Sequence, residues 1–332
     1  MRYLIIDLAN MFFRSRHVVR GDIDTKVGMA MHITLASVNK MYKKFGADHV
    51  VFCVEGNSWR KKIYPRYKKN RSDARAAKSP RDQEEEEVFL ETLTELTKYL
   101  QERTNCSVIK HEQAEGDDIV ARWIDLHPED NHIIISSDSD FAQLLSENVQ
   151  QYDGVKGHLI TLAGTIDDND NIVMDKKTGQ PKAPPDPEWL LFEKCMRGDS
   201  SDNIFSAYPG VRKKGTKTKT GLLEAFDDRF KQGFSWNNLM LQRWTDHEGV
   251  EHRVLDDYER NRKLIDLRAQ PEEIKQGIDL EIKNQVSNKK VQQVGIWFLK
   301  FCGKHELISL SDMGTQISEW LNKYYQGALK ND

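Results

Sequence analysis

The chain has 332 residues, of which 38% are hydrophobic and 30% charged, and its 49 Lys and Arg against 52 Asp and Glu give a formal net charge of −3. This length is enough for one large or two modest domains, and its 7 Trp, 10 Tyr and 13 Phe argue against disorder. No apolar run approaches the roughly 18 residues needed to cross a bilayer, which excludes a membrane protein.

The N-terminus and the cysteines both indicate a reducing compartment. The chain enters an apolar run within its first residues, without the basic stretch and cleavage site of a signal peptide. Cys53, Cys106, Cys195 and Cys302 lie far apart and form no Cys-x-x-Cys pair. We therefore expect a cytoplasmic protein, in the host cytoplasm if it is phage-encoded, with reduced and mostly buried thiols.

The first two hundred residues alternate short β-branched runs with amphipathic segments. We expect strands at 3–6, 50–54, 107–109 and 132–135, and a helix at 29–41. Ser79 as N-cap and Pro80 at the first helical position begin another helix, which carries Phe89, Leu93 and Leu96 on one face. This alternation predicts an α/β fold with a mostly parallel central sheet flanked by helices.

The composition changes after the predicted sheet. Residues 154–187 are rich in Asp, Asn, Gly, Lys and Pro, which indicates a hairpin excursion and a linker rather than core. A helix at 188–196, ending at Gly198, opens a second, mainly helical region that closes with two amphipathic helices near 291–301 and 313–324. We therefore expect an α/β domain at 1–186 and a helical domain at 187–332.

Carboxylates gather where the predicted strands end. Asp7 follows the first strand, Glu55 the second, and Asp138 and Asp140 the strand at 132–135. Because ligands bind at the carboxyl ends of the strands in an open α/β sheet, we expect these side chains to lie close together. Five more acids belong to two further motifs, at the start of a helix and in the loop after 188–196: Glu115, Asp117, Asp118, Asp199 and Asp202.

Nine carboxylates at one edge would repel each other unless cations compensate. Oxygen ligands select hard ions such as Mg²⁺, with Mn²⁺ as a substitute, over Zn²⁺. One octahedral ion cannot take nine carboxylates, so we expect two or more ions. A pair of Mg²⁺ ions suits in-line phosphoryl chemistry, in which one activates water and the other stabilises the leaving oxygen.

Basic residues are concentrated in two stretches. Residues 60–81 contain ten Lys and Arg against one acid, with aromatic residues interleaved, and residues 212–219 contain five cations and no acid. Aromatic rings beside cations suit stacking on unpaired bases, although such a run can also be an ordinary solvated surface. The candidate nucleic-acid-binding residues are Arg60, Tyr67, Lys69, Arg212, Lys213, Lys214, Lys217 and Lys219.

Six motifs occur in the order and approximate spacing of the flap endonuclease/5′-3′ exonuclease family: Asp7, Glu55, Tyr67-Lys68-Lys69-Asn70-Arg71, Glu115-Gly116-Asp117-Asp118, Ser137-Asp138-Ser139-Asp140 and Gly198-Asp199-Ser200-Ser201-Asp202-Asn203-Ile204. Residues 1–270 resemble this family. Within it, the likeness is closest to phage ribonuclease H of the T-even type and its phage 5′-exonuclease relatives.

The resemblance implies a metal-dependent nuclease with a PIN-like core that removes 5′ flaps and RNA primers, acting on branched or flapped DNA and on RNA–DNA hybrids. It implies that Lys68 and Arg71 are catalytic cations at the scissile phosphate, that Tyr67 stacks on a base, and that residues 61–100 form an arch for the 5′ strand. It also assigns metal ligands: Asp7, Glu55, Glu115 and Asp117 to the first ion, Asp138, Asp140, Asp199 and Asp202 to the second, and Asp118 as shared or acting through water.

Two departures from the family pattern matter. Glu55 stands where the family usually has Asp. Residues 210–217 carry Lys213 and Lys214 where the duplex-binding helix-turn-helix usually has glycine and an apolar residue. We infer that side-chain charge replaces some backbone contacts to the duplex, which makes a bound K⁺ doubtful. A replication clamp and a single-strand-binding protein are candidate partners, and a monomer is expected by default.

Other functions remain as alternatives. A PIN-like ribonuclease shares the acidic sheet edge but normally lacks the basic arch and the long helical region. A branched-DNA-binding protein without catalysis would not need carboxylates at all the expected positions. A haloacid-dehalogenase-type phosphatase is disfavoured because Ala9 stands where that mechanism uses a second Asp.

Overall fold

The computed structural model describes residues 1–17, 19–288 and 290–330. The chain divides into two compact units. The core unit comprises Met1–Ser58, Lys78–Pro185 and Pro271–Asp332, and the helical unit comprises Trp59–Ala77 and Asp186–Gln270. In this division the C-terminal segment groups with the core unit, and residues 59–77 group with the helical unit.

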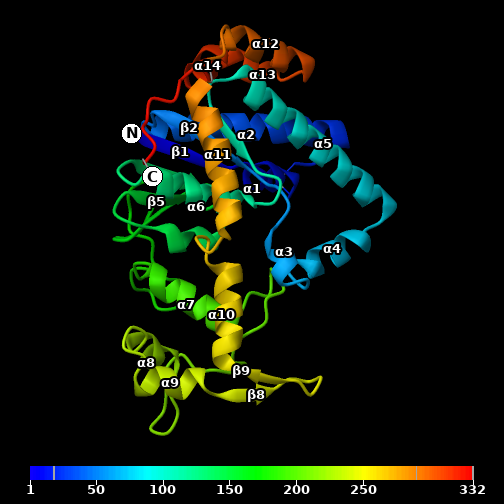
Figure 1. Cartoon of the computed structure of the whole chain (residues 1–332). Coiled ribbons are helices and arrows are strands. Elements are labelled where there is room, and N and C mark those ends of the chain that lie inside the picture. The colour runs from blue at the N-terminus through cyan, green and yellow to red at the C-terminus, as the bar shows by residue number, and fades with distance from the viewer. Residues whose placement is uncertain (18, 289, 331–332) are drawn as a thin grey trace. The chain divides into compact units, whose positions relative to one another are not determined.

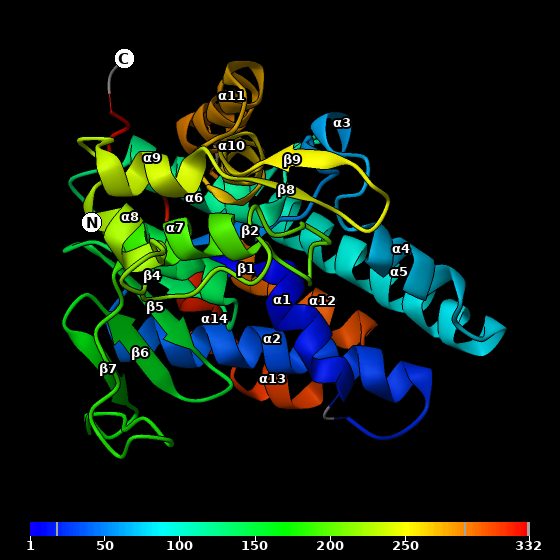
Figure 2. The ribbon, with the colours of Figure 1, turned by 90° about the horizontal axis from the view of Figure 1, so that it is seen from below.

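A seven-stranded sheet forms the centre of the core unit, in the order β3-β2-β1-β4-β5-β6-β7. The pairings from β3 through β5 are parallel, whereas β6 pairs antiparallel with β5, and β7 antiparallel with β6. Figure 2 shows β6 and β7 at one edge of the sheet. Their bounds are β1 Arg2–Asp7, β2 His49–Val54, β3 Ser107–Lys110, β4 Asn131–Ile135, β5 Val149–Asp153, β6 His158–Thr161 and β7 Gly164–Asp167. In the register, Ile6 pairs with both Phe52 and Ile135, so the carboxyl ends of β2, β1 and β4 are level.

Helices cover both faces of this sheet (Figure 1). Alternate strand residues such as Leu4 and Ile6 share a hydrophobic core with residues of α2, α5, α12 and α14. The ring of Tyr3 instead contacts Trp123 of α6 edge-on, with 5.2 Å between the ring centroids. Helix α11 packs on α6 and β3. The bounds are α1 Leu8–Arg14, η1 Ser15–His17, α2 Ile23–Phe45, α5 Pro80–Arg103, α6 Gly116–Leu126, η2 Ser139–Leu144, α11 Glu272–Asn288, α12 Val294–Lys304, α13 Ile308–Asp312 and α14 Gly314–Leu321.

The observed core confirms the predicted fold class, the four expected strands, and the start of α5 at the Ser79 cap. Strand β5 was not among the expected strands. The hairpin expected within 154–187 is part of the sheet, because β6 pairs with β5. The segment 271–332 belongs to the core unit because Phe298, Ile317 and Trp320 are buried with strand residues in one hydrophobic core.

The helical unit is built around an aromatic core. Phe192 lies 5.3–6.3 Å from the rings of Phe226, Trp236 and Tyr258. Helix α7 begins where expected, with the Asp186 carboxylate capping it. The bounds are α3 Arg60–Ile63, α4 Lys69–Ala76, α7 Pro187–Arg197, α8 Leu222–Asp227, α9 Phe234–Met240, β8 Arg243–Thr245, β9 Glu251–Arg253 and α10 Val254–Ile265. An irregular loop, residues 198–221, joins α7 to α8. The helix-turn-helix-type segment expected in this region stays a prediction.

Two expectations concern the whole chain. In the described part of the chain, no helix combines the length and the apolar character that crossing a bilayer requires. The four cysteines, all among the described residues, are buried and form no disulfide, as expected.

Candidate functional site

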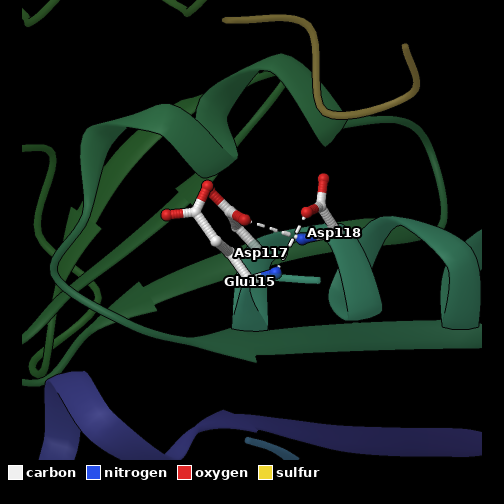
Figure 3. A group of neighbouring side chains, drawn as sticks. All are labelled: Glu115, Asp117 and Asp118. Atoms are coloured by element: carbon white, nitrogen blue, oxygen red, sulfur yellow. Dashed lines mark hydrogen bonds between the residues drawn. The ribbon is translucent and has the colours of Figure 1, made fainter. Parts of the chain in front are cut away.

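Three carboxylates gather at the first turn of α6 (Figure 3). Ligand oxygens of Glu115, Asp117 and Asp118 all lie within 4.8 Å of one another. The Asp118 carboxylate accepts the backbone N–H of Glu115 at 3.1 Å, and Asp117 accepts that of Asp118 at 2.7 Å. Asp118 therefore caps the helix, whereas the carboxylates of Glu115 and Asp117 lie side by side.

Glu55, directly after β2, reaches the same helix terminus. Its carboxylate accepts the backbone N–H of Gly116 at 2.8 Å. A Cβ on Gly116 would lie 3.3 Å from this carboxylate, so glycine allows the close approach. Ser58 donates to Glu115 at 2.8 Å. The positive end of the helix dipole favours anions at this position.

Asp7 joins the group from β1. It pairs in register with Cys53 of β2. Burial, followed by the nearby charges of Asp7 and Asp117, raises the pKa of the Cys53 thiol well above its usual value. The four residues that the resemblance assigns to the first metal thus lie at the carboxyl ends of β1 and β2 and at the start of α6.

The loop after β4 carries Asp138 and Asp140. The Ser136 hydroxyl donates to the Asp7 carboxylate at 3.0 Å and accepts the backbone N–H of Asp138 at 3.1 Å. The buried Gln151 side chain, from β5, donates to the carbonyl oxygens of Ser136 at 3.0 Å and Asp138 at 2.6 Å. Asp138 accepts the backbone N–H of Asp140 at 2.9 Å, which fixes the start of η2.

Asp199 and Asp202 belong to the helical unit, in the loop after α7. The Asp199 carboxylate pairs with Lys194 at 2.8 Å and accepts the backbone N–H of Ser201 at 2.8 Å. Burial raises the pKa of Asp199, but the hydrogen bond and charge of Lys194 and the hydrogen bonds of Ser201 outweigh it, so the net shift is downward. Gly198 permits the turn, because its φ is 74° and a Cβ there would lie 2.3 Å from a backbone oxygen.

Asp202 connects this loop to the basic segment at 59–77. Its carboxylate accepts the Tyr67 hydroxyl at 3.1 Å and pairs with Arg71 at 2.5 Å. The Lys68 ammonium lies 3.9 Å from the Asp202 carboxylate. The Lys68 backbone N–H donates to the backbone carbonyl of Asp202 at 2.8 Å. The two cations that the resemblance assigns to the scissile phosphate are therefore held by one carboxylate.

Two predicted nucleic-acid contacts are not supported by the structure. Tyr67 is 3% exposed and its ring belongs to the hydrophobic core of the helical unit, so it offers no open face to a base. Arg60 is 1% exposed, and its guanidinium donates to the carbonyl of Leu264 at 2.7 Å and lies over the Trp59 ring. Both side chains hold the 59–77 segment to the unit. Lys69 is exposed, and its contact with nucleic acid stays a prediction.

The second basic stretch presents its cations to solvent. All five cations at 212–219 are open to solvent: Arg212, Lys213, Lys214, Lys217 and Lys219. A cavity of about 460 Å³ is lined by this loop, by 208–211 and by Asn238, Leu239 and Gln242. The position of these cations agrees with the predicted basic surface.

Several positioning residues were missed by the sequence analysis. Ser136 and Gln151 hold the Asp138 loop, and Lys194 pairs with Asp199. The sequence held one usable signal: Ser136 directly precedes the acidic motif. Gln151 and Lys194 carry no local signal, because their partners are set by strand pairing and by helix packing.

Comparisons with known proteins agree with this geometry. The profile of the 5′-3′ exonuclease N-terminal resolvase-like domain matches residues 2–177. Flap endonuclease Xni of Shewanella loihica is 30% identical over 229 residues, covering 68% of this chain and 77% of that protein. DNA polymerase I of Rhizobium leguminosarum is 30% identical over 227 residues, covering 66% of this chain and 19% of that protein.

Solved structures share the fold. The phage T5 5′-exonuclease with bound zinc has a TM-score of 0.60 at 18% identity, covering 86% of this chain and 98% of that chain. A complex of the phage T5 flap endonuclease with DNA and metal ions has a TM-score of 0.55 at 18% identity, covering 96% of this chain and 100% of that chain. With the sequence matches, the acidic sheet edge leads to one conclusion: this chain belongs to the flap endonuclease/5′-3′ exonuclease family.

Proposed function

We propose that the protein is a structure-specific 5′ nuclease that hydrolyses phosphodiesters in flapped DNA and in the RNA of RNA–DNA hybrids. One observation carries the proposal. Asp7 and Glu55 stand at the carboxyl ends of neighbouring strands, and the Glu55 carboxylate contacts the start of α6, where Glu115 and Asp117 lie. Such an edge is where open α/β sheets bind ligands.

The donor set fits hard divalent ions. Within the described residues, the group at α6 consists of carboxylate oxygens alone, and oxygen ligands favour Mg²⁺ or Mn²⁺. We propose that Asp7, Glu55, Glu115 and Asp117 hold one ion, with Asp118 acting through water. We propose a second ion on Asp138, Asp140, Asp199 and Asp202. When bound, the ions would activate the attacking water and stabilise the leaving oxygen.

Lys68 and Arg71 supply positive charge for the phosphate in this proposal. Both pair with Asp202. A substrate phosphate offers charge-assisted hydrogen bonds of the same kind, and Arg can bind it in bidentate fashion. Lys68 has a left-handed backbone, with φ 52°, at the residue before α4, and its backbone N–H is fixed to the Asp202 carbonyl. The position of the Lys68 backbone is thus set by the fold.

The basic segments would hold the nucleic acid. We propose that residues 61–100 guide the 5′ strand and that the 212–219 cations contact duplex phosphates. Phosphate contacts by Lys and Arg release counterions, so affinity should fall steeply with salt. A monomeric state, cytoplasmic residence and contact with a clamp or a single-strand-binding protein stay predictions.

A panel of 5′-labelled substrates tests the proposed function. A single-flap DNA, a single strand, a blunt duplex and an RNA–DNA hybrid are incubated with Mg²⁺ or with EDTA. We expect cleavage near the flap junction and within the hybrid RNA only with metal. The variant Asp117→Asn should lose this metal-dependent cleavage. The variant Asp125→Asn, further along α6, should keep it. Equal cleavage of all four substrates, or cleavage in EDTA, contradicts the proposal.

A further inference from the structure

The exposed basic loop of the helical unit has a closed backbone. We call residues 212–221 the lysine loop. The N–H of Leu222 donates to the carbonyl of Arg212 at 3.0 Å, and that of Leu223 donates to Lys213 at 2.9 Å. These bonds join the two ends of the loop, so that it forms a compact unit of the Ω-loop kind. Its cations are therefore presented from an ordered backbone.

The interior of the lysine loop contains a carboxylate from outside it. Glu224, in the first turn of α8, is half-buried. The N–H of Gly215 donates to its two carboxylate oxygens at 3.1 and 3.0 Å, and the N–H of Gly221 donates to one of them at 2.9 Å. Backbone amides that converge in this way form a nest, which is an anion-binding concavity. Here the anion is part of the chain.

Both glycines are required by the close packing around this carboxylate. A Cβ on Gly215 would lie 2.5 Å from the carbonyl oxygen of Lys219. A Cβ on Gly221 would lie 2.4 Å from the backbone nitrogen of Gly215 and 2.8 Å from the Glu224 carboxylate. The two sides of the loop therefore touch through their backbones, with the carboxylate between them.

The carboxylate is ionised at neutral pH. Burial raises the pKa of Glu224, but hydrogen bonds from its own backbone N–H and from those of Gly215 and Gly221, together with the charge of Lys214, outweigh burial. The net pKa lies below the usual value for Glu. The nest is thus filled by a permanent negative charge, and a phosphate could enter it only by displacing Glu224.

We propose that Glu224 is a positioning residue of the duplex-binding surface. It fills the amide nest of the lysine loop, so that duplex DNA is held here by the side-chain cations, with neither a phosphate nor a monovalent metal ion in the nest. K⁺ needs oxygen ligands, whereas the groups around the nest are N–H donors that are already bonded to the Glu224 carboxylate. This inference rests on the proposed duplex binding and specifies its chemistry.

Duplex affinity provides the first test. Anisotropy of a labelled blunt duplex is measured in EDTA for Glu224→Ala and for Asp227→Ala, which removes an exposed carboxylate from the same helix. Each variant loses one negative charge, so Coulomb attraction alone would strengthen binding to DNA in both. We expect Asp227→Ala to bind as tightly as wild type or more tightly, and Glu224→Ala to bind about five- to tenfold more weakly.

The variant Glu224→Gln is the control for unfolding of the protein, because its amide oxygen can still accept a hydrogen bond from one of the backbone N–H groups. We expect an intermediate loss of affinity with an unchanged melting temperature. In wild type, replacing K⁺ by Na⁺ at constant ionic strength should leave affinity unchanged. Equal affinity of Glu224→Ala and Asp227→Ala, or a clear requirement for K⁺, overturns the inference.

Amide shifts provide the second test. In the full chain labelled with ¹⁵N-glycine, the Gly215 and Gly221 amide resonances should titrate together in acid in wild type and not in Glu224→Gln. Saturating duplex should leave both resonances nearly unchanged. Large shifts of both on duplex binding would place a phosphate in the nest and overturn the inference. Failure of the proposed function is distinguishable, because it appears as a lack of metal-dependent cleavage by wild type.

Discussion

The backbone N–H of Gly116 donates a 2.8 Å hydrogen bond to the carboxylate of Glu55. This contact joins the end of β2 to the start of α6, and it gives a structural role to the glutamate at a position where the resemblance leads us to expect aspartate. The longer side chain reaches the helix terminus. A residue without a Cβ on the other side makes room for it.

Shortening this side chain should therefore uncouple the two elements. Glu55→Asp is one methylene too short for the Gly116 contact, and we expect a loss of about 1 kcal/mol in the free energy of unfolding. Activity should also fall, with a higher Mg²⁺ requirement. Urea unfolding and a metal titration of cleavage check this. Unchanged stability in Glu55→Asp would show that the hydrogen bond contributes nothing to the fold.

Asp117 and Asp118 should respond in opposite ways. Asp117→Asn relieves repulsion between carboxylates, so in EDTA its melting temperature should equal or exceed that of wild type. Mg²⁺ should raise the melting temperature of wild type, because binding to the folded state stabilises it, and should not raise that of Asp117→Asn. Differential scanning fluorimetry with and without Mg²⁺ measures both effects.

Asp118→Ala removes a helix cap instead. The Asp118 carboxylate accepts the Glu115 N–H, and loss of such a cap costs about 1 kcal/mol. We expect a lower melting temperature in EDTA and a retained rise with Mg²⁺. The same behaviour in Asp117→Asn and Asp118→Ala would refute the distinction between ligand and cap.

Gln151 should control metal affinity through the loop that carries Asp138. Gln151→Leu removes two hydrogen bonds to that loop, and we expect the Mg²⁺ concentration for half-maximal cleavage to rise about tenfold, as for other residues that orient ligands. Gln150→Leu, one position earlier on β5, is the matched control. If both variants keep the wild-type metal dependence, Gln151 has only a packing role.

The Lys194–Asp199 pair should make the stability of the helical unit pH-dependent. The pKa of Asp199 is lowered on folding, so its contribution is present above the unfolded pKa and is lost as pH falls through the folded one. In EDTA, Asp199→Asn should be less stable than wild type at pH 7, and the difference should shrink below about pH 4. Urea unfolding between pH 7 and 3.5 tests this. A constant difference would exclude the ionised pair as its cause.

Local signals predicted much of the core and its acidic edge. The carboxylates could be placed because they follow apolar runs that become adjacent parallel strands, and the Ser79-Pro80 pair marks the start of α5 by its own capping chemistry. Both signals lie within a few residues of what they predict. The positions of Asp7, Glu55 and Asp138 at the strand ends follow from them.

The features that could not be predicted from the sequence depend on tertiary contacts. Arg60 is buried by the carbonyl of Leu264, and Tyr67 by Asp202 and an aromatic core, and these partners lie more than a hundred residues away in the chain. The same alternation of cations and aromatic residues in a sequence is compatible with side chains that face water and with side chains that are buried in a core. The placement of 271–332 in the core unit likewise depends on packing that no local pattern shows.

In the proposed function, the carboxylates at the sheet edge bind the divalent ions with which the protein hydrolyses a phosphodiester. The most direct measurement is single-turnover cleavage of a 5′-labelled flap at increasing Mg²⁺, for wild type, Asp117→Asn and Asp125→Asn. We predict no cleavage in EDTA, a steep rise with more than first-order dependence on Mg²⁺ for wild type and Asp125→Asn, and no rise for Asp117→Asn. Full cleavage in EDTA, or wild-type rates in Asp117→Asn, would contradict the account.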